Sequence, residues 1–389
     1  MAIVTDLLKE LDGLTSEQIT ELIEQLEVKR SVLLKEDGLD GLLTEAGKVI
    51  ACPACGSASD IKKSGHTNGK QRYKCNACGK TFQASTGTIF AHSHLTSEQW
   101  CIIIEGTIEN LSLSQIADKT GISKASVSLN RNKILAMIND IFMEQDELSG
   151  IVQLDERSVH MSYKGKRDSN FFIDRLNRLP RHHMSDAEKI EWLKKHGQYE
   201  KVAKDPERLD RLLHGKANYM PGTNRDNICI LTGIDNSNNA MARAVCVGSI
   251  ESKHVHDELI CRLDNSSVMV TDGNPSYNDF AEMENIQHDV VTSDKHAVGN
   301  RNLGKVNAYH SDMSAFWSDH KENLPPTKYL DIGLALFWWL EKNKDLSIKQ
   351  KVDEILGYIK NTPNHFTRES IKQKKVYIDF KFTGIPDQL

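Results

Sequence analysis

The sequence predicts a multidomain α/β chain, and three observations support this fold class. Two C-x-x-C pairs lie in a segment poor in large apolar residues, the run from Leu95 to about Glu144 follows a helical pattern, and the chain from Gly150 alternates strand-like with helix-like runs. The 389 residues suffice for two or three domains. Hydrophobic and charged contents of 39% and 26% are ordinary for a globular protein.

The N-terminal residues 1–47 carry apolar positions at helical spacing and predict two short helices. Thr15 or Ser16 can cap a helix that carries Ile19, Leu22, Ile23 and Leu26. The first residues turn acidic at once, which argues against a secretory signal. The longest apolar runs, such as LALFWWL near residue 337, are too short to cross a bilayer. We therefore expect a cytoplasmic protein with no membrane partner.

Residues 48–92 are expected to form a zinc ribbon. CPACG at 52–56 and CNACGK at 75–80 place 19 residues between the two knuckles, a spacing typical of a four-thiolate zinc site. The alternative, a redox dithiol, normally has a single pair before a helix. The segment is too small to form an apolar core, so it needs the metal to fold. The predicted ligands are Cys52, Cys55, Cys75 and Cys78.

The net charge of −5 conceals a basic segment around these knuckles. Residues 46–95 hold seven Lys or Arg and one acid, Asp60, whereas residues 1–47 hold 11 acids and four bases. Local charge decides whether a surface binds phosphate, so this segment indicates a nucleic-acid partner. Lys70 and Arg72 are the candidate contacts on the ribbon.

Residues 93–147 are expected to form a helix-turn-helix domain. LSLSQIADKTGISKASVSLNRNKI predicts a helix, a tight turn at Gly121, an N-cap at Ser123 and a second helix, with Ala117 where the helices pack. A plain helical hairpin gives a similar pattern, but the adjacent zinc module favours binding of double-stranded DNA. The candidate DNA contacts on the second helix are Lys124, Ser126, Arg131 and Lys133.

Residues 148–345 predict a ribonuclease-H-like domain. Strand-like runs at 150–156, 227–235, 242–249, 267–273 and 288–293 give three meander strands followed by alternating helices and strands. Helix-like runs lie at 253–263, 277–284, after Gly304 and at 329–341. Residues 157–226, which hold 16 Lys or Arg, fit an insertion after the first strand, and such a charged insert is usually a solvated surface. Residues 346–389 are expected to form a helical or extended tail.

Two aspartates at predicted strand ends suggest a catalytic metal site. Asp155 and Asp272 each close an apolar strand, and the predicted strand order places those strands side by side. Two buried carboxylates repel each other unless a cation lies between them, and Mg²⁺ prefers oxygen ligands. The alternative is that each Asp only caps the following turn. The pair together favours two-metal phosphoryl transfer.

The same fold predicts a third ligand on the helix at 306–317. Asn307 and His310 share one face of that helix, and no Glu occurs between residues 285 and 322. Asp312 would point about 200° away from His310. His310 is therefore the leading candidate, as a neutral imidazole, with Asn307 in support. Glu156 should point to the opposite face of the sheet and is expected to be a structural neighbour.

These residues resemble the insertion-sequence transposases of the ISXO-two-like group, the family numbered fifteen ninety-five. The similar motifs are CPACG with CNACGK, LDE (154–156) followed by SYKGKR, ICILTGID, VTDGNPSY, VNAYHS and TKYLD (327–331), and they extend from about residue 49 to 342. The resemblance matches Asp155 and Asp272 to the two acids of the family, and Asn307 with His310 to its variable third position. Where close relatives carry a lysine, this chain has Ser314, and Lys321 is the next candidate.

The resemblance implies a DDE-type transposase that binds the terminal inverted repeats of its own element. It would cleave and join DNA with Mg²⁺, for which Mn²⁺ can substitute, held by Asp155, Asp272 and His310. It would work as a homo-oligomer on DNA, associated with the nucleoid. The competing hypothesis is a decayed element whose zinc ribbon and helix-turn-helix still bind DNA while the catalytic domain is inert.

Overall fold

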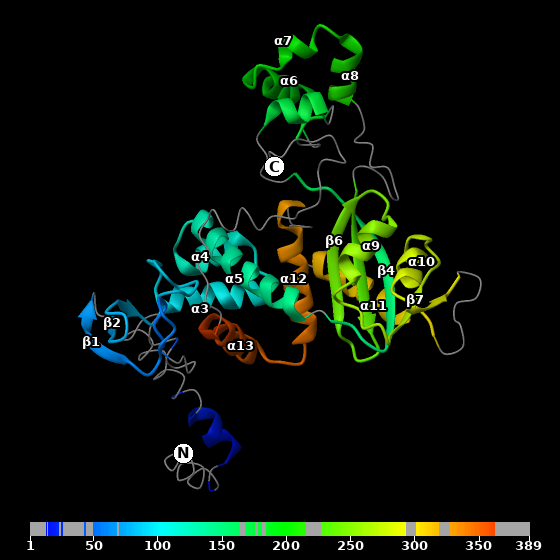
Figure 1. The fold of residues 1–389 in the computed structure, drawn as a ribbon. Helices are drawn as coiled ribbons and strands as arrows, with labels where there is room; N and C mark the ends of the chain where they lie inside the picture. Colours follow the sequence, from blue (N-terminus) through cyan, green and yellow to red (C-terminus); the bar gives the residue numbers. More distant parts are fainter. Residues whose placement is uncertain are drawn as a thin grey trace. The chain divides into compact units, whose positions relative to one another are not determined.

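The computed structural model describes residues 13, 15–22, 25, 43, 50–67, 70–145, 147–163, 168–175, 178–180, 184–214, 227–292, 301–318 and 327–361. The chain is a mixed α/β, multidomain protein (Figure 1). It has two compact units: of the described residues, those up to Ile141 and those at 339–361 form one, and those of Phe142–Trp338 form the other. These units are larger than the five regions predicted from the sequence. The division into five regions therefore stays a prediction.

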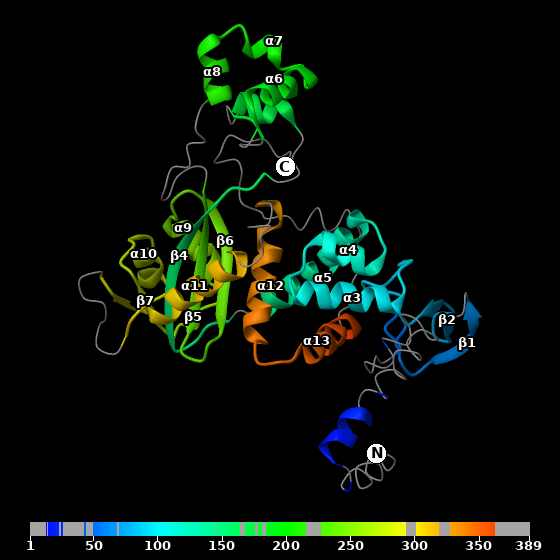
Figure 2. The same cartoon turned by 180° about the vertical axis from the view of Figure 1, so that it is seen from behind.

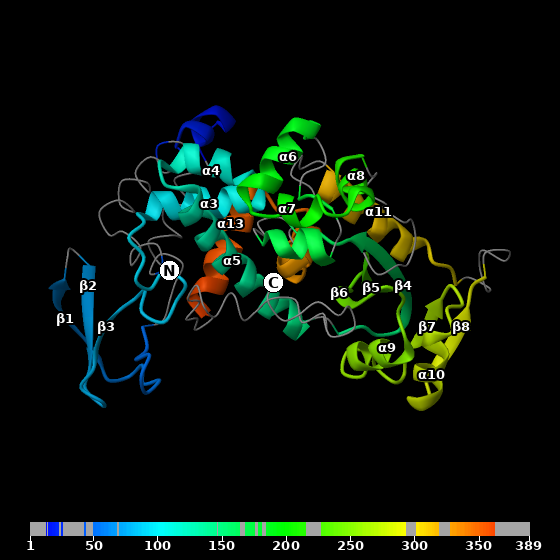
Figure 3. The same cartoon turned by 90° about the horizontal axis from the view of Figure 1, so that it is seen from above.

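The first unit contains a small antiparallel sheet of three strands in the order β1-β2-β3, seen side by side in Figure 3. The strands are β1 (Ile61–Thr67), β2 (Lys70–Cys75) and β3 (Thr81–Gln83). Tyr73 on β2 pairs with Phe82 on β3, and their rings stack with centroids 5.8 Å apart. This single aromatic pair is a small apolar core, as expected for a module that depends on metal.

The helical segment predicted at 93–147 lies in the same unit. It consists of α3 (Ser97–Ile108), α4 (Leu113–Thr120) and α5 (Lys124–Gln145). Gly121 ends α4 with a φ of 69°, and the Ser126 amide donates to the Ser123 hydroxyl at 3.2 Å. The turn glycine and the N-cap are thus confirmed, because a left-handed φ favours glycine and an N-cap oxygen accepts from the first turn.

Two further helical segments belong to the first unit. Residues 16–22 are helical, and Thr15 caps them by accepting from the Gln18 amide at 3.3 Å, as predicted. The predicted positions Ile23 and Leu26 lie outside the described residues. Helix α13 (Ile348–Asn361) packs against α3. The helical part of the predicted tail therefore belongs to the core of this unit.

The second unit is built on a five-stranded sheet in the order β6-β5-β4-β7-β8. Strand β4 is antiparallel to β5, β5 is antiparallel to β6, and β4, β7 and β8 run parallel. The observed strands are β4 (Ile151–His160), β5 (Asn227–Asp235), β6 (Ala240–Val247), β7 (Val268–Thr271) and β8 (Gln287–Val290). Three meander strands followed by parallel strands is the order that the sequence predicted.

Helices cover both faces of this sheet. Helices α9 (Ser252–Leu259) and α10 (Ser276–Met283) pack on one face, and α11 (Gly304–Ser318) lies on the other (Figures 1 and 2). The core under α9 and α10 includes Val152, Leu154, Val255 and Phe280, all buried. Because strand side chains alternate in direction, Gln153, Asp155 and Arg157 face α11 instead. Helix α12 (Leu330–Lys342) follows a 3₁₀ turn at Thr327–Tyr329.

The first strand is longer than predicted, which corrects the position of Asp155. Strand β4 continues to His160, with Arg157 to His160 paired to the first residues of β5. Asp155 therefore lies within β4 and does not close it. The predicted insert at 157–226 begins after His160, because the ladder with β5 extends the strand beyond its apolar part.

The described part of the insert has a core of its own. It contains a π-helical turn (Phe171–Arg175), α6 (Asp186–Lys195), α7 (Tyr199–Val202) and α8 (Pro206–His214). Leu193, Val202 and Leu212 are buried together with Ile173 and Leu179. Residues 184–214 hold seven Lys or Arg and seven Asp or Glu, so these helices are electrically balanced. Within the described residues, no helix is long and apolar enough to cross a membrane.

Candidate functional site

The described residues contain two clusters that could hold a metal ion, one of thiols and one of carboxylates. The thiol cluster joins Cys52, Cys55, Cys75 and Cys78, with all four sulfurs within 4.8 Å of one another. Both knuckles share one conformation: the Gly56 amide donates to the Cys52 carbonyl, and the Gly79 amide to the Cys75 carbonyl. These two glycines have φ values of 73° and 74°, which the tight turn requires.

The thiol geometry fits a tetrahedral ion. The sulfurs of Cys52 and Cys78 lie 3.5 Å apart, and those of Cys55 and Cys75 lie 3.6 Å apart. Zinc–sulfur bonds of about 2.3 Å at tetrahedral angles place sulfurs about 3.8 Å apart. Desolvation raises the pKa of Cys52, but amide donors from Ala54 and Cys55 outweigh it and lower the pKa to about 6. At Cys55 the Ser57 amide lowers the pKa, but the thiols of Cys75 and Cys78 raise it to about 12, so without a metal only part of the cluster favours the thiolate form that binds metal.

The carboxylate cluster joins residues that lie far apart in the sequence. Asp155, Glu156 and Asp272 each present one carboxylate oxygen, and these oxygens lie within 4.8 Å of one another. The two neighbours on β4 come within reach of Asp272 because β4 and β7 run parallel, with Gln153 opposite Val270. Asp155 is thus level with position 272, the first residue after β7. The predicted pairing of Asp155 with Asp272 is present in the structure.

The side chain of Glu156 lies on the opposite face of the sheet from Asp155, as predicted. It points to the face of α10, where Tyr277 donates to its Oε2 at 2.7 Å and the Asn274 amide donates to its Oε1. It also belongs to the carboxylate cluster, which the sequence did not indicate. Strand β7 ends at Thr271, so no strand separates the two faces at this level. Side chains from both faces of β4 can therefore approach Asp272.

The cluster is electrostatically unfavourable without a cation. Burial, together with the charges of Glu156 and Asp272 and against one backbone hydrogen bond, raises the pKa of Asp155 to about 6. Burial is also the main cause of the raised pKa of Glu156. A bound cation would favour the ionised form of these carboxyl groups. A site whose ligand atoms are all oxygens suits Mg²⁺.

Helix α11 is held to β4 by two side chains on one face of the strand, those of Gln153 and Arg157. Gln153 Oε1 accepts from the amides of Lys305 and Val306 at 2.9 and 3.1 Å, which caps the helix. Arg157 donates to the His310 carbonyl at 2.7 Å and to the Ser314 hydroxyl at 2.6 Å. Asp155 lies between them. These contacts fix the rotation of α11 against the sheet.

His310 lies beside Asp155, as the fold prediction required. Its Nδ1 is 3.6 Å from Asp155 Oδ2, and its Nε2 is 2.6 Å from the hydroxyl of Thr232 on β5. Burial, together with the charge of Arg157, lowers the pKa of His310 to about 4. The imidazole is therefore neutral near pH 7, which a metal ligand requires. The sequence had indicated neither Thr232 nor Arg157, because cross-strand partners depend on register.

The other predicted residues near α11 are less involved. Asn307 is exposed on α11, one turn before His310, and is not part of the carboxylate cluster. Ser314 accepts from Arg157 and donates to the His310 carbonyl at 2.8 Å. Arg157 thus brings a positive charge to Ser314, the position where the resemblance implies a lysine. Lys321 lies outside the described residues.

The predicted DNA contacts of the ribbon lie on β2. Arg72 is exposed, and Lys70 is partly exposed at the start of the strand. Lys62 on β1 pairs in register with Lys74 on β2, and Arg72 is two residues from Lys74. Since residues two apart share a face of a strand, Lys62, Arg72 and Lys74 form one basic face.

The predicted contacts on α5 have different environments. Lys124 is exposed in the first turn. Arg131 donates to the Leu111 carbonyl at 2.7 Å and to Asn110 Oδ1 at 2.6 Å, so its guanidinium braces the loop before α4. Lys133 is partly buried, and desolvation lowers its pKa. Ser126 is partly exposed, and its hydroxyl accepts from Ser123.

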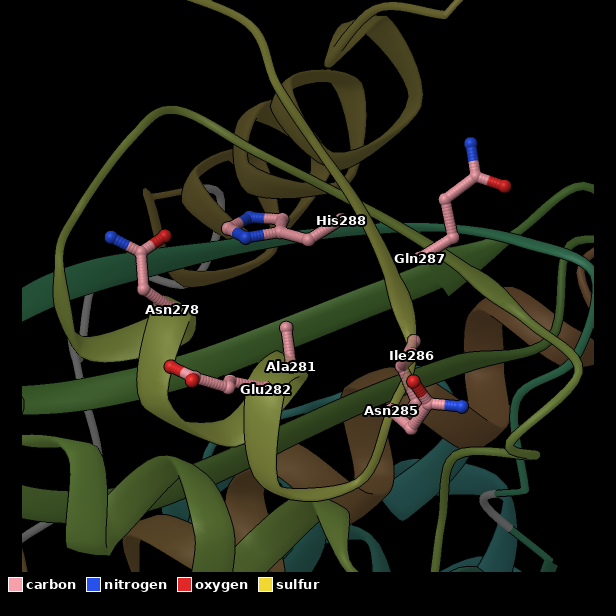
Figure 4. A pocket seen from close by; sticks show the side chains of 7 residues that line it. All are labelled: Asn278, Ala281, Glu282, Asn285, Ile286, Gln287 and His288. Carbon is pink, nitrogen blue, oxygen red and sulfur yellow. The ribbon is translucent and has the colours of Figure 1, made fainter.

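A pocket of about 520 Å³ lies between α10 and β8 (Figure 4). It is lined by Asn278, Ala281, Glu282, Asn285, Ile286, Gln287 and His288. His288 Nε2 lies 2.9 Å from the Thr271 hydroxyl, next to Asp272 in the chain. None of the seven lining residues belongs to the carboxylate cluster, so the pocket is distinct from it.

Comparisons with known proteins give one sequence similarity. The chain matches no family model. Over 118 residues, or 30% of the chain, it is 30% identical to an uncharacterized protein in transposable element ISH50 of Halobacterium salinarum. The match spans 39% of that protein, so about two fifths of its length is covered. Among solved structures, a pre-cleavage Mos1 transpososome is 10% identical, over 68% of this chain and 79% of that chain, with a TM-score of 0.22.

Proposed function

We propose that this chain is a transposase that cleaves and joins DNA strands in its carboxylate cluster and binds the ends of its element through the ribbon and the helix-turn-helix. The observation that carries the proposal is the convergence of Asp155, Glu156 and Asp272 within 4.8 Å beside a neutral histidine. The similarity to a protein of a transposable element supports it. The strand order supports assigning the sheet to the ribonuclease-H-like fold.

In this proposal the carboxylates and His310 have distinct roles. Asp155 and Asp272 would hold Mg²⁺ or Mn²⁺, Glu156 would complete the oxygen set, and His310 would be the nitrogen ligand nearest to Asp155. When bound, such ions act as Lewis acids that polarise a phosphoryl oxygen and lower the pKa of water. Asn307, exposed on the same helix, is a candidate contact to the DNA strand or to water. The exposed side of Asp272 leaves room for a phosphodiester.

The remaining parts of the proposal concern binding. Lys62, Arg72 and Lys74 would contact phosphates from the ribbon, with zinc in its thiol site, and Lys124 would contact them from α5. Arg131 would instead hold the DNA-binding helices together. Because an element has two ends, we propose a homo-oligomer that holds both ends on double-stranded DNA.

A cleavage assay on a labelled duplex with the inverted repeat from the flanking DNA tests this proposal. We expect strand cleavage in Mg²⁺ or Mn²⁺, and a loss of at least about 10³-fold in Asp272→Asn, because several kilocalories of transition-state stabilisation depend on the ions. Asp312→Asn, an exposed acid on α11, is the matched control and should keep wild-type activity.

Two outcomes would contradict the proposal. Tight binding of the duplex without cleavage in either ion would indicate the competing hypothesis, a DNA-binding protein with an inert catalytic domain. Cleavage that ignores the end sequence would indicate a general nuclease.

A further inference from the structure

Thr232 is a buried polar residue on β5, directly opposite Asp155 in the antiparallel ladder. Its hydroxyl oxygen lies 2.8 Å from the Asp155 carbonyl oxygen and 2.6 Å from His310 Nε2. A carbonyl oxygen only accepts, so the single hydroxyl hydrogen must be donated to Asp155 for that contact to be a hydrogen bond. Both contacts can then be hydrogen bonds only if His310 Nε2 carries a hydrogen and donates it to Thr232.

The other ring nitrogen of His310 follows from this assignment. A neutral imidazole carries one hydrogen, so Nδ1 has a lone pair. Nδ1 faces Asp155 Oδ2 at 3.6 Å, which is too long for a hydrogen bond. Asp155 Oδ1 already accepts from the Glu156 amide at 2.8 Å, which leaves Oδ2 as the oxygen directed at the ring. Two lone pairs therefore face each other in a partly buried site.

The separation of these two atoms suits two ligands of one cation. With metal–ligand bonds of about 2.1 Å, adjacent ligand atoms of an octahedral ion lie about 3 Å apart and opposite ones about 4 Å. The distance of 3.6 Å is about 0.6 Å longer than that between adjacent ligands, so a small shift of either side chain would bring both atoms onto one ion. The helix backbone that carries the ring is held in place, because Arg157 donates to the His310 carbonyl and Gln153 caps α11.

We propose that Thr232 is a positioning residue that holds His310 as the Nε2–H tautomer, so that Nδ1 becomes the ligand atom of a metal position shared with Asp155. The inference rests on the proposed function for the role of that metal, but the tautomer is a property of the protein before that metal binds. Other metal-binding histidines donate the hydrogen of their second ring nitrogen to a carboxylate or a carbonyl, and this bond fixes the tautomer. Here the Thr232 hydroxyl is the acceptor.

The first test is the tautomer in the full-length chain, with zinc retained in the thiol cluster and no Mg²⁺ or Mn²⁺ added. Long-range ¹H–¹⁵N spectra of the histidine-labelled protein at neutral pH, with His310 assigned through His310→Gln, should show the Nε2–H form. Thr232→Ser should preserve this form, and Thr232→Val should not. Thr271→Val is the matched control, because it removes a buried hydroxyl from another strand of the sheet and breaks a contact with another histidine, His288. It should leave the His310 signals unchanged.

The second test is Mn²⁺ affinity, measured by titration followed by electron paramagnetic resonance. Loss of such a supporting hydrogen bond weakens metal binding by about 10–100-fold, so Thr232→Val should lower the affinity by at least tenfold. Thr232→Ser should stay close to wild type, and His310→Gln should be at least as weak as Thr232→Val. Thermal unfolding of each variant checks that it is folded.

The inference and the proposed function fail in different ways. An Nδ1–H tautomer in the wild type, or Thr232→Val with unchanged tautomer and Mn²⁺ affinity, would overturn the inference even if the protein cleaves DNA. The expected tautomer and affinities, in a protein that cleaves no DNA, would support the inference and remove the proposed function.

Discussion

The thiol cluster and the carboxylate cluster are both candidate metal sites, but they are assembled in opposite ways. Each pair of thiols lies within one four-residue knuckle, and the two knuckles have the same backbone conformation. The carboxylates come from β4 and from the end of β7, more than 100 residues away along the chain. A local site of this kind is recognisable from spacing, whereas a distributed site depends on the register of the sheet.

The difference extends to what each metal would do for folding. The ribbon has little apolar core apart from the Tyr73 and Phe82 pair, so its fold would depend on the ion. The sheet of the second unit has an extensive core that includes Leu154, Leu231, Met269 and Phe280. Its carboxylates are held in place by that core and would lose only binding, and not folding, when the ion is removed.

The substitution Cys75→Ser tests this contrast and has the largest expected effect. Structural zinc in small modules contributes apparent binding free energies of about 10–16 kcal/mol, so loss of one thiolate should release zinc and unfold residues 50–83. Metal analysis by mass spectrometry and amide hydrogen exchange would measure both. Cys101→Ser, a thiol on α3 outside the cluster, is the control. A ribbon that stays protected without zinc would contradict the contrast.

The next effect concerns Glu156, whose membership of the carboxylate cluster the sequence did not predict. Glu156→Gln keeps an oxygen that can accept from Tyr277 but removes the charge. We expect Mn²⁺ affinity to fall by about tenfold, as for other changes in or next to a ligand set, while the fold is preserved.

Tyr277→Phe provides the control for Glu156, because it removes the hydrogen bond to the carboxylate and keeps the charge. It should change Mn²⁺ affinity less than Glu156→Gln does. Equal affinities in wild type and Glu156→Gln would show that Glu156 has only the structural role first expected for it.

Much of the fold could be predicted from the sequence, because strand and helix periodicities, Gly121 and Ser123 are local signals. The four thiols, Asp155 and Asp272 could also be found. The roles of Glu156, Arg157 and Thr232 could not, because each depends on where β4 continues, where β7 stops and which residue of β5 is opposite Asp155. The alternation of Gln153, Asp155 and Arg157 was the available signal that one face of β4 is polar.

A smaller effect concerns the pH dependence of stability without metal. The pKa of Asp155 is about 6 in the folded chain, above its ordinary value of 3.8, so the folded state favours the protonated form. Its contribution to stability is present below pH 3.8 and is lost as the pH rises through 6. Asp155→Asn should therefore gain stability relative to wild type between pH 4 and pH 7, by on the order of 1 kcal/mol.

Thermal unfolding in chelator across this range measures the difference. His310 acts in the opposite direction, because its folded pKa of about 4 gives a contribution that is present above pH 6.5 and lost as the pH falls. It is present in both proteins, so the comparison of Asp155→Asn with wild type isolates Asp155 to first order. A difference that is constant with pH would show that neither burial nor the neighbouring carboxylates raise the pKa of Asp155.

The smallest effect concerns Ser314, where the resemblance implies a lysine. Ser314→Ala removes one hydrogen bond from Arg157, which keeps its bond to the His310 carbonyl, so we expect a loss of about 1 kcal/mol in unfolding free energy and little change in DNA cleavage. Ser314→Lys should be more harmful than Ser314→Ala, because it places an ammonium group against the guanidinium of Arg157. If Ser314→Lys instead raised cleavage, the positive charge of Arg157 would not replace the lysine that the resemblance implies at this position. The hydrogen bonds of Arg157 that fix α11 would then not be needed for cleavage.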